Sequence, residues 1–394
     1  MIILIKVLTF LFCFISFPLK SNAQTLFFKE GNIGEAMFAA KSAGKPICFM
    51  GYANWCGHCH TMKETVLLDS SVNSFFSENF VCYMQDMEQG DGIEFRRKYR
   101  IRSYPAFVFM DQDGKLQYMV IGEFKAPEFI AEGKNALNPE KQLPTLKQKF
   151  DMDVSNAENY TNFLTALRKA KLDYDEITKK YFKTQSDSQL ISEANWKLIS
   201  QGVRDYDSRE IQFVMKHRKE FDSIATPEKV NRKLVSTVWE SLNPLVERGD
   251  TLNYFRKRKT GAAMGLPKSD SLIFSFDMRI AEKTKNWNAY KKVTLASTDK
   301  YYGKSQFMLK NIATAYLNNI SDKTALKQAA EWAKKATALR EDYTCYLTAA
   351  KLFKRVNDTN SALQMAQAGK DFAGKFKWDT TEADNLIKEL TGKE

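Results

Sequence analysis

The feature that most constrains the fold of this chain is a change of pattern close to residue 140. Upstream, apolar runs of strand length alternate with helical patterns, whereas after Pro139 and Pro144 the strand signals fade and glycine becomes sparse. Alternating strands and helices predict an α/β domain, and successive amphipathic helices predict an all-α domain. We therefore expect an α/β domain over residues 24–140 and a helical domain over residues 141–394.

The first residues of the chain have the pattern of a secretory signal peptide. Residues 1–17 are almost entirely apolar, and the small residues Ser21 and Ala23 precede Gln24 at the positions that signal cleavage requires. We expect residues 1–23 to be removed. No later run approaches the roughly 18 apolar residues of a transmembrane helix, so no membrane span is expected after cleavage. The mature protein is then exported, to the periplasm in a Gram-negative cell and to the outside otherwise.

Apolar periodicity places the elements of the N-terminal domain. An amphipathic helix is predicted from Ile33 to about Gly44, because apolar residues recur there at helical spacing. Apolar runs predict strands at 46–53, 80–84, 106–110 and 116–121, and further helices are expected after Cys56, at 92–99 and at 126–136. Asp113-Gly114 predicts a hairpin between the last two strands. The expected order, β-α-β-α-β-α-β-β-α, gives a mixed sheet with helices on both faces.

The stretch C-G-H-C-H at residues 56–60 fits two chemistries. Cys56 and Cys59 form a C-x-x-C dithiol, and with His60 they also form the C-x-x-C-H attachment site of a c-type haem. A haem needs a large enclosed space, whereas this motif directly follows a buried apolar strand. A zinc site at the same residues lacks a fourth ligand at a suitable spacing. We therefore favour the dithiol, and expect no metal and no cofactor apart from a redox-active Cys56–Cys59 disulfide.

Three stretches carry a family resemblance. W-C-G-H-C-H-T-M-K, E-N-F-V-C-Y-M-Q-D-M and K-Y-R-I-R-S-Y-P-A-F-V-F-M-D-Q-D-G-K together resemble the thioredoxin superfamily over residues 25–137. The resemblance is strongest to exported bacterial thioredoxin-like proteins with a W-C-x-x-C active site. The tetrapeptide C-G-H-C is the one found in protein disulfide isomerases. The resemblance implies a thioredoxin fold and thiol–disulfide exchange.

The resemblance also implies roles for the residues of the motif. Cys56, with Gly57 after it, would lie at an exposed helix N-terminus, where the helix dipole favours a nucleophilic thiolate. His58, when protonated, would stabilise that thiolate further. Cys59, one turn on, would be the resolving thiol. Stabilising the reduced thiolate favours an oxidising or isomerising poise.

Further positions are implied to support the site. Trp55 would shield the dithiol and offer a flat surface to a substrate. Tyr104 and Pro105 match the family's cis-proline position, which presents backbone to an incoming peptide. The chain departs from the family at Met50, where a buried Asp or Glu is usual, so proton transfer at Cys59 would rely on water or on another side chain such as His60.

The remaining cysteines and histidine have simpler interpretations. Cys48 and Cys82 lie on strands that would be neighbours in this fold, and they are either two buried thiols or a second disulfide. Cys345 is expected to be a buried thiol in a helix. His217 has no partner pattern and is expected on the surface.

Charge is unevenly distributed along the chain. Residues 24–140 carry 12 basic and 15 acidic residues, and residues 141–394 carry 45 basic and 32 acidic residues. The basic excess of the helical domain fits solvated helix faces or an acidic partner. Nucleic acid is not an expected partner, because no aromatic-basic motif is present.

The helical domain offers one clear start signal and a hint of repetition. Thr226-Pro227 predicts the start of a helix that ends before Gly249. From about residue 309, small residues recur at an offset of 33, namely Ala329, Ala333 and Ala336 followed by Ala362, Ala366 and Gly369. This fits tetratricopeptide-type repeats. A non-repetitive bundle fits equally, and no repeat is apparent in residues 145–305.

These patterns predict an exported thiol–disulfide oxidoreductase. It would exchange disulfides with protein thiols and with a redox partner protein, and the helical domain would supply contacts to partners. The alternative is a non-catalytic binding or scaffold protein that uses a thioredoxin-like domain and helical repeats for recognition.

Overall fold

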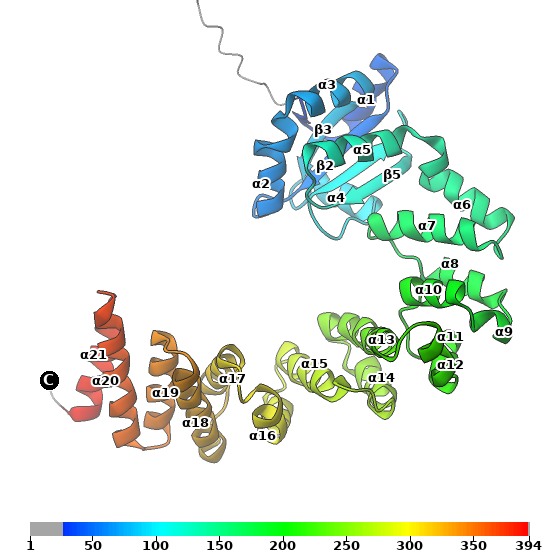
Figure 1. Cartoon of the computed structure of the whole chain (residues 1–394). Helices are drawn as coiled ribbons and strands as arrows, with labels where there is room; N and C mark the ends of the chain where they lie inside the picture. The colour runs from blue at the N-terminus through cyan, green and yellow to red at the C-terminus, as the bar shows by residue number, and fades with distance from the viewer. Residues whose placement is uncertain (1–26, 393–394) are drawn as a thin grey trace, which may run out of the picture. The chain divides into compact units, whose positions relative to one another are not determined.

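The chain forms two compact units, which are described here separately over residues 27–392 from a computed structural model (Figure 1). The first unit ends at Gln185 and the second begins at Ser186. The first unit contains a five-stranded sheet, and the second contains only helices among its described residues. The expected fold class, an α/β domain followed by an all-α region, is confirmed. The expected signal peptide at residues 1–23 lies outside the described residues.

The division between the units differs in position from the expected one. Three helices beyond residue 140, α6 (Leu143–Met152), α7 (Ala157–Lys169) and α8 (Asp175–Lys183), belong to the first unit. Both α6 and α7 contact the last strand of the sheet. Lys169 at the end of α7 pairs with Glu132 at 2.7 Å, which ties the added helices to the α/β fold. A domain boundary at residue 140 stays a prediction.

The sheet has the strand order β1-β3-β2-β4-β5. Its strands are β1 (Lys29–Glu30), β2 (Ile47–Tyr52), β3 (Val81–Asp86), β4 (Ala106–Met110) and β5 (Leu116–Ile121). β1, β3 and β2 run parallel, and β4 is antiparallel to both β2 and β5. Gly114 has a φ of 76° in the turn between β4 and β5, as the Asp113-Gly114 signal predicts. The expected mixed sheet is confirmed.

Helices cover both faces of this sheet (Figure 1). Successive side chains of β2 point to opposite faces, so Cys48 and Met50 enter one core cluster while Ile47 and Phe49 enter the other. α2, α3 and α5 cover the first face, and α1 and α4 cover the second. These helices are α1 (Ile33–Ala43), α2 (Gly57–Glu64), α3 (Ser70–Asn79), α4 (Asp91–Lys98) and α5 (Ala126–Leu137), with short 3₁₀ helices η1 (Val66–Leu68) and η2 (Pro139–Lys141).

The helix after the motif is interrupted, which differs from the single helix expected there. α2 ends at Glu64, where Thr65 leaves the helical conformation with φ −124° and ψ −67°. A separate helix, α3, then begins because the Asp69 carboxylate accepts hydrogen bonds from the backbone N–H groups of Ser71 and Val72. The aromatic side chains of α3 complete the core under α5.

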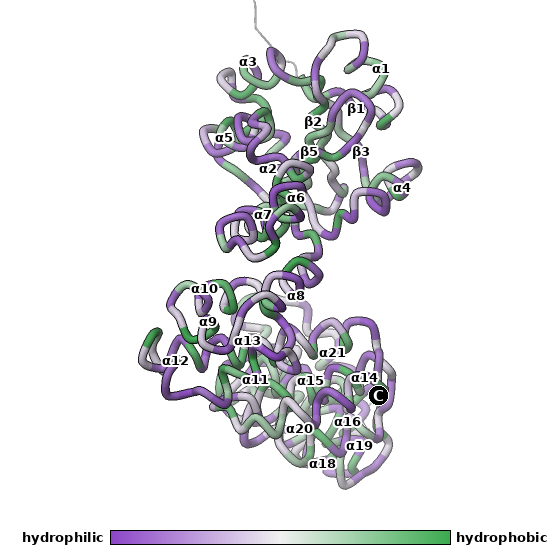
Figure 2. The backbone as a smooth tube through the Cα atoms, turned by 90° about the vertical axis from the view of Figure 1, so that its right-hand side faces the viewer, coloured by the Kyte–Doolittle hydropathy of each residue, from purple (hydrophilic) through white to green (hydrophobic). Residues whose placement is uncertain are grey.

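The second unit is a series of helices that pack on their sequence neighbours. They are α9 (Asp187–Leu190), α10 (Glu193–Gly202), α11 (Arg209–Lys216), α12 (Arg218–Ile224), α13 (Pro227–Arg248), α14 (Thr251–Ala263), α15 (Ser269–Lys283), α16 (Trp287–Tyr302), α17 (Gln306–Asn319), α18 (Lys323–Leu339), α19 (Tyr343–Arg355), α20 (Thr359–Lys375) and α21 (Thr381–Thr391). Hydrophobic and hydrophilic residues alternate within these helices, as expected when one face of a helix packs on its neighbours and the other meets solvent (Figure 2). The Thr226 cap and the left-handed Gly249 bound α13 as predicted.

Helix caps in this unit recur at a regular interval of 36 residues. Asp250, Asn286, Asp322 and Asp358 are the N-caps of α14, α16, α18 and α20, and each side chain accepts a hydrogen bond from the backbone N–H three residues on. The interval of 36 residues between caps exceeds the expected offset of 33 between small residues by three positions, which is about one helical turn. Small residues recur every three or four positions on a packed helix face, so a shift of one turn still aligns small with small. The regular arrangement also starts earlier than residue 309, since it includes α14 and α16.

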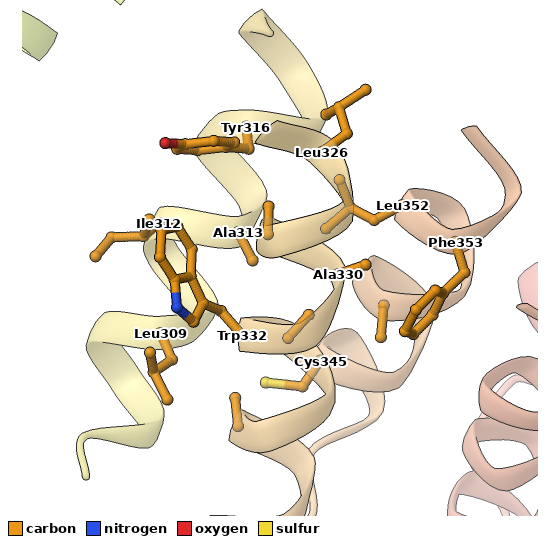
Figure 3. Close-up of a cluster of buried hydrophobic side chains, with 14 of the residues drawn as sticks. Leu309, Ile312, Ala313, Tyr316, Leu326, Ala330, Trp332, Cys345, Leu352 and Phe353 are labelled. Atoms are coloured by element: carbon orange, nitrogen blue, oxygen red, sulfur yellow. The ribbon is translucent and has the colours of Figure 1, made fainter. Parts of the chain in front are cut away.

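Close packing of α17, α18 and α19 explains the small residues. Figure 3 shows Trp332 of α18 beside α17, and Cys345 of α19 among the alanines of the same cluster. Ala329, Ala333 and Ala336 are all fully buried. In α20, a Cβ at Gly369 would lie 2.9 Å from the Tyr346 Cβ, so only glycine fits without a shift. Small side chains therefore set the distance between successive helices.

Replacing Phe129 with alanine tests the core beneath the first sheet face. Phe129 is fully buried, with its ring 4.3 Å from that of Phe76 and 4.5 Å from that of Phe107. We expect Phe129→Ala to lower the free energy of unfolding of the first unit by about 3–5 kcal/mol, because the neighbouring Phe76 and Phe107 rings limit how far the cavity can collapse. Urea unfolding measures this. Phe38→Ala, at a side chain that is 77% exposed, is the control and should cost less than about 0.5 kcal/mol.

Candidate active site

Four strand ends meet at one edge of the sheet. Tyr52 at the end of β2 is level with Asp86 at the end of β3, and Gly51 is level with Ala106 at the start of β4. Ala106 is in turn level with Ile121 at the end of β5. Cys56, Glu88 and Glu123 lie on the segments that leave β2, β3 and β5, and Pro105 lies directly before β4. The topology therefore gathers residues that are far apart in the sequence.

Cys56 and Cys59 lie at the start of α2 and form a disulfide. Cys56 is the N-cap residue, and its Sγ accepts a hydrogen bond from the backbone N–H of Cys59 at 3.2 Å. N–H groups of a first helical turn and the helix dipole stabilise negative charge at this position. Cys56 is 5% exposed and Cys59 is 1% exposed. Both cysteines are therefore buried, although Gly57 and His58 beside them are exposed, so Cys56 is less accessible than expected.

His58 forms an ion pair with an acid that the sequence did not indicate. Its Nδ1 lies 2.6 Å from Oε2 of Glu123, which follows β5. Gly122 positions this acid: its φ is 127°, a conformation that favours glycine, and its N–H donates to the Pro105 carbonyl at 2.9 Å. The contact spans 65 residues of sequence. No local sequence pattern predicts the contact between His58 and Glu123, because only the pairing of β4 with β5 brings the two residues together.

Trp55 is held beside the dithiol while the residue stays 72% exposed. Its Nε1–H donates to Oε2 of Glu88 at 2.8 Å, and its ring lies edge-on to Tyr104 at 6.1 Å. Arg96 closes the ring of contacts by donating to the Tyr104 hydroxyl at 3.2 Å and pairing with Glu88 at 3.6 Å. The sequence alone did not indicate that Glu88 and Arg96 belong to the candidate site. The arrangement presents a fixed aromatic surface next to Cys56.

The Tyr104–Pro105 peptide bond is cis, as the resemblance implies. Pro105 is buried and directly precedes β4, and Tyr104 packs against the core cluster that contains both Cys56 and Cys59. The structure thus brings Trp55, Tyr104, Pro105 and the two cysteines to one edge of the sheet. The roles assigned to them remain predictions.

Met50 and His60 define the surroundings of Cys59. Met50 is fully buried in the same hydrophobic cluster as Cys59. His60 directs its Nε2 at the Asn54 carbonyl oxygen, 2.9 Å away. Over residues 27–392, no three His, Cys, Asp or Glu side chains are grouped so that they could hold a metal ion.

The other three cysteines within residues 27–392 are buried thiols. Cys48 and Cys82 are level with each other on β2 and β3, and they are not joined by a disulfide. Burial and the neighbouring Cys82 thiol raise the pKa of Cys48 well above its usual value. Burial raises the pKa of Cys345 to about 11. His217 is half-buried rather than fully on the surface, stacked on Phe213 and paired with Glu220 at 3.1 Å.

Comparisons with known proteins agree with this geometry. A family model for thioredoxin-like domains matches residues 33–137. The thiol:disulfide interchange protein DsbD of Ralstonia nicotianae is 27% identical over 117 residues, which are 29% of this chain and 19% of that protein. Thioredoxin-1 of Drosophila melanogaster is 35% identical over 65 residues, which are 16% of this chain and 56% of that protein. The chain therefore spans only part of each of these relatives.

Two further findings concern a solved structure and membrane spans. The solution structure of a proposed disulphide-isomerase from Bacteroides thetaiotaomicron is 32% identical and covers 29% of this chain and 96% of its own, with a TM-score of 0.28. Within the described part of the chain, no helix is both long and apolar enough to cross a membrane.

Counting accessible thiols tests the assignment of the cysteines. In the chain beginning at Gln24, we expect no rapid reaction with a thiol reagent in the native oxidised state, because Cys48, Cys82 and Cys345 are buried. Denaturation should expose three thiols, and denaturation after reduction should expose five. Ellman's reagent gives these counts directly. A single thiol on denaturation would show instead that Cys48 and Cys82 are joined.

Proposed function

Given that residues 33–137 are a thioredoxin-like domain, we propose that this chain is an exported thiol–disulfide oxidoreductase that acts on protein substrates. The observation that carries the proposal is the Cys56–Cys59 disulfide at the N-terminus of α2. The relation to a thiol:disulfide interchange protein supports the same reaction class. Export rests on the sequence pattern of residues 1–23.

The proposed exchange moves two electrons in two steps. In the reducing direction, the Cys56 thiolate attacks a substrate disulfide, so that a mixed disulfide forms and one substrate thiolate leaves with the bonding electron pair. Cys59 then attacks the Cys56 sulfur, which releases the second substrate thiolate and forms the Cys56–Cys59 disulfide. Each departing thiolate takes up a proton, one of them the proton lost by Cys59. The oxidising direction is the reverse of these steps.

The environment of each sulfur suits its proposed step. The backbone N–H groups and dipole at the start of α2 favour a thiolate at Cys56, which makes it the attacking and the leaving group. Cys59 is almost fully buried, so its thiol meets the mixed disulfide rather than free substrate. With Met50 in place of a carboxylate, the Cys59 proton passes to solvent or to the departing thiolate.

Trp55 and the Tyr104–Pro105 segment are the proposed contacts for the substrate chain. Trp55 is exposed and held by Glu88, so it offers a flat apolar surface without losing side-chain entropy on binding. The backbone at the cis peptide lies at the same edge of the sheet as the dithiol. The helical unit is proposed to recruit partners, because arrays of paired helices form extended binding surfaces.

The regular helix array also favours a second candidate function. In it, the chain is a scaffold whose thioredoxin-like domain binds partners without turnover. The two candidates differ in whether the dithiol forms covalent intermediates, which the next experiment measures.

A Cys59→Ser variant should accumulate mixed disulfides with its substrates. Cys56 can still attack, but the resolving thiol is absent, so the intermediate is released only slowly by external thiols. We expect several-fold more disulfide-linked complexes on non-reducing gels than with the wild type, and none with Cys56→Ser, which is the matched control. Equal and negligible trapping by both variants, together with no reversible redox couple, would support the scaffold.

Replacing His58 tests its effect on the reduction potential. The His58 imidazole, when protonated, stabilises the Cys56 thiolate, so its removal with Glu123 left behind destabilises the reduced form. We expect His58→Ala to lower the potential by about 30 mV, which corresponds to roughly 1.4 kcal/mol for a two-electron couple. Equilibration in glutathione buffers measures this. His60→Ala is the matched control and should change the potential by less than about 10 mV, because His60 faces the Asn54 carbonyl.

A further inference from the structure

A pocket lies in the helical unit, among α10, α12 and α13, and its chemistry differs from that of the dithiol site. Its volume is about 520 Å³, which is within the usual range for ligand pockets. The lining residues that matter here are Trp196, Lys197, Ser200, Lys229, Arg232 and Lys233. None of them is part of the dithiol site or of the proposed contacts around it.

The pocket is strongly cationic. Four basic side chains line it, Lys197, Lys229, Arg232 and Lys233, against the single acid Glu193, which leaves an excess of three positive charges. Lys233 is only 7% exposed and lies 3.5 Å from Glu240. Among the described residues, no acid lies within ion-pairing distance of the other three cations. Elsewhere in the unit, Lys291 and Lys310 are each paired with an aspartate, Asp322 and Asp342.

Ser200 supplies an independent observation on α10. Its Oγ is buried, and it has no hydrogen-bond partner within the described part of the chain. Buried hydroxyl groups in folded proteins nearly always have a partner, so a partnerless one in the lining of a pocket indicates a group that arrives with a ligand. A hydroxyl can donate to an anionic oxygen, which matches the charge of the surrounding cations.

The shape of the pocket suits an extended peptide segment. On α13, Lys229, Arg232, Lys233 and Ser236 lie on one face over about two turns, a length of roughly 10 Å. About three extended residues span that length. The lining also contains apolar groups, those of Trp196, Ile224 and Ala225, which a free inorganic ion would leave uncovered.

We propose that this pocket binds an acidic segment of a partner protein, with one apolar residue flanked by carboxylates. The carboxylates would pair with Lys229, Arg232 and Lys197 at the rim, and one would accept a hydrogen bond from the Ser200 hydroxyl. The apolar side chain would rest on Trp196 and Ile224. This goes beyond the proposed redox function, because it needs neither Cys56 nor Cys59.

The test is fluorescence anisotropy with the chain from Gln24 to Glu394. The probe is a labelled, end-capped hexapeptide that carries four carboxylates around one leucine, and the comparison peptide replaces each acid with its amide. We expect the acidic peptide to bind at about 50 mM salt, to weaken as salt rises, and to bind at least tenfold more tightly than the amide peptide. Equal binding of the two peptides would overturn the proposal.

Matched variants locate the binding to this pocket. Lys229→Gln and Arg232→Gln should each weaken the acidic peptide about tenfold, whereas Lys259→Gln, which removes an exposed charge from α14 outside the pocket, should leave affinity unchanged. Ser200→Ala should weaken binding about fivefold without lowering the melting temperature, because its hydroxyl has no partner to lose. Wild-type affinity in all three pocket variants would refute the assignment.

Two further measurements distinguish a peptide site in this pocket from a site for a small ion and from peptide binding at the dithiol. Inorganic phosphate that binds the pocket in the absence of any affinity for the peptide would show an ion site and overturn the peptide assignment. The Cys56→Ser, Cys59→Ser double variant should bind the peptide as the wild type does. Loss of binding in that variant would place the peptide at the dithiol and refute the second site.

Discussion

Burial of β2 on both faces and along both edges is the constraint on which the rest of the first unit depends. Its backbone pairs with β3 on one side and with β4 on the other, and its side chains enter two separate cores. A strand in that position can leave the sheet only at its end, beyond Tyr52. The chain must then turn within a few residues into a helix, and the N-cap of that helix is Cys56. The dithiol is thus positioned by a strand that is buried on both faces and paired along both edges.

The same constraint explains how charges reach the dithiol. Because β4 runs antiparallel to β2, the start of β4 and the end of β5 lie at the edge where β2 and β3 end. Glu88 and Glu123 therefore approach from two different strands, one holding Trp55 and the other His58. When His58 is protonated, its positive charge is partly balanced by Glu123, which moderates the stabilisation that a Cys56 thiolate receives.

The helical unit is organised differently, by helix caps and small residues that repeat along the sequence. Asx caps at intervals of 36 residues start the second helix of each pair, and buried alanines let successive helices approach closely. In such arrays each helix pair depends mainly on its neighbours, so the outer faces are free to carry binding groups. The basic excess of residues 141–394 is partly used in ion pairs between helices and partly gathered in the pocket between α10 and α13.

Local signals were sufficient for much of this molecule. The strands at residues 106–110 and 116–121 have the predicted bounds, the helix from Ile33 ends before Gly44, and α13 has the predicted caps. Each of these depends on apolar periodicity or on a capping residue, which act over a few positions. The break of the motif helix at Thr65 was not predicted, because the apolar residues Met62 and Leu67 continue a helical pattern across it.

The sequence by itself determined the fold class, the C-G-H-C dithiol and the place where the strand signals cease, because these depend on residue type and short-range spacing. The tertiary structure decided that Glu123 meets His58, that Glu88 holds Trp55, and that Ser200 and Lys233 line the same cationic pocket. These contacts join residues 33 to 65 positions apart. They follow from strand pairing and helix packing, whose free energy is shared among many residues and therefore leaves no local mark in the sequence.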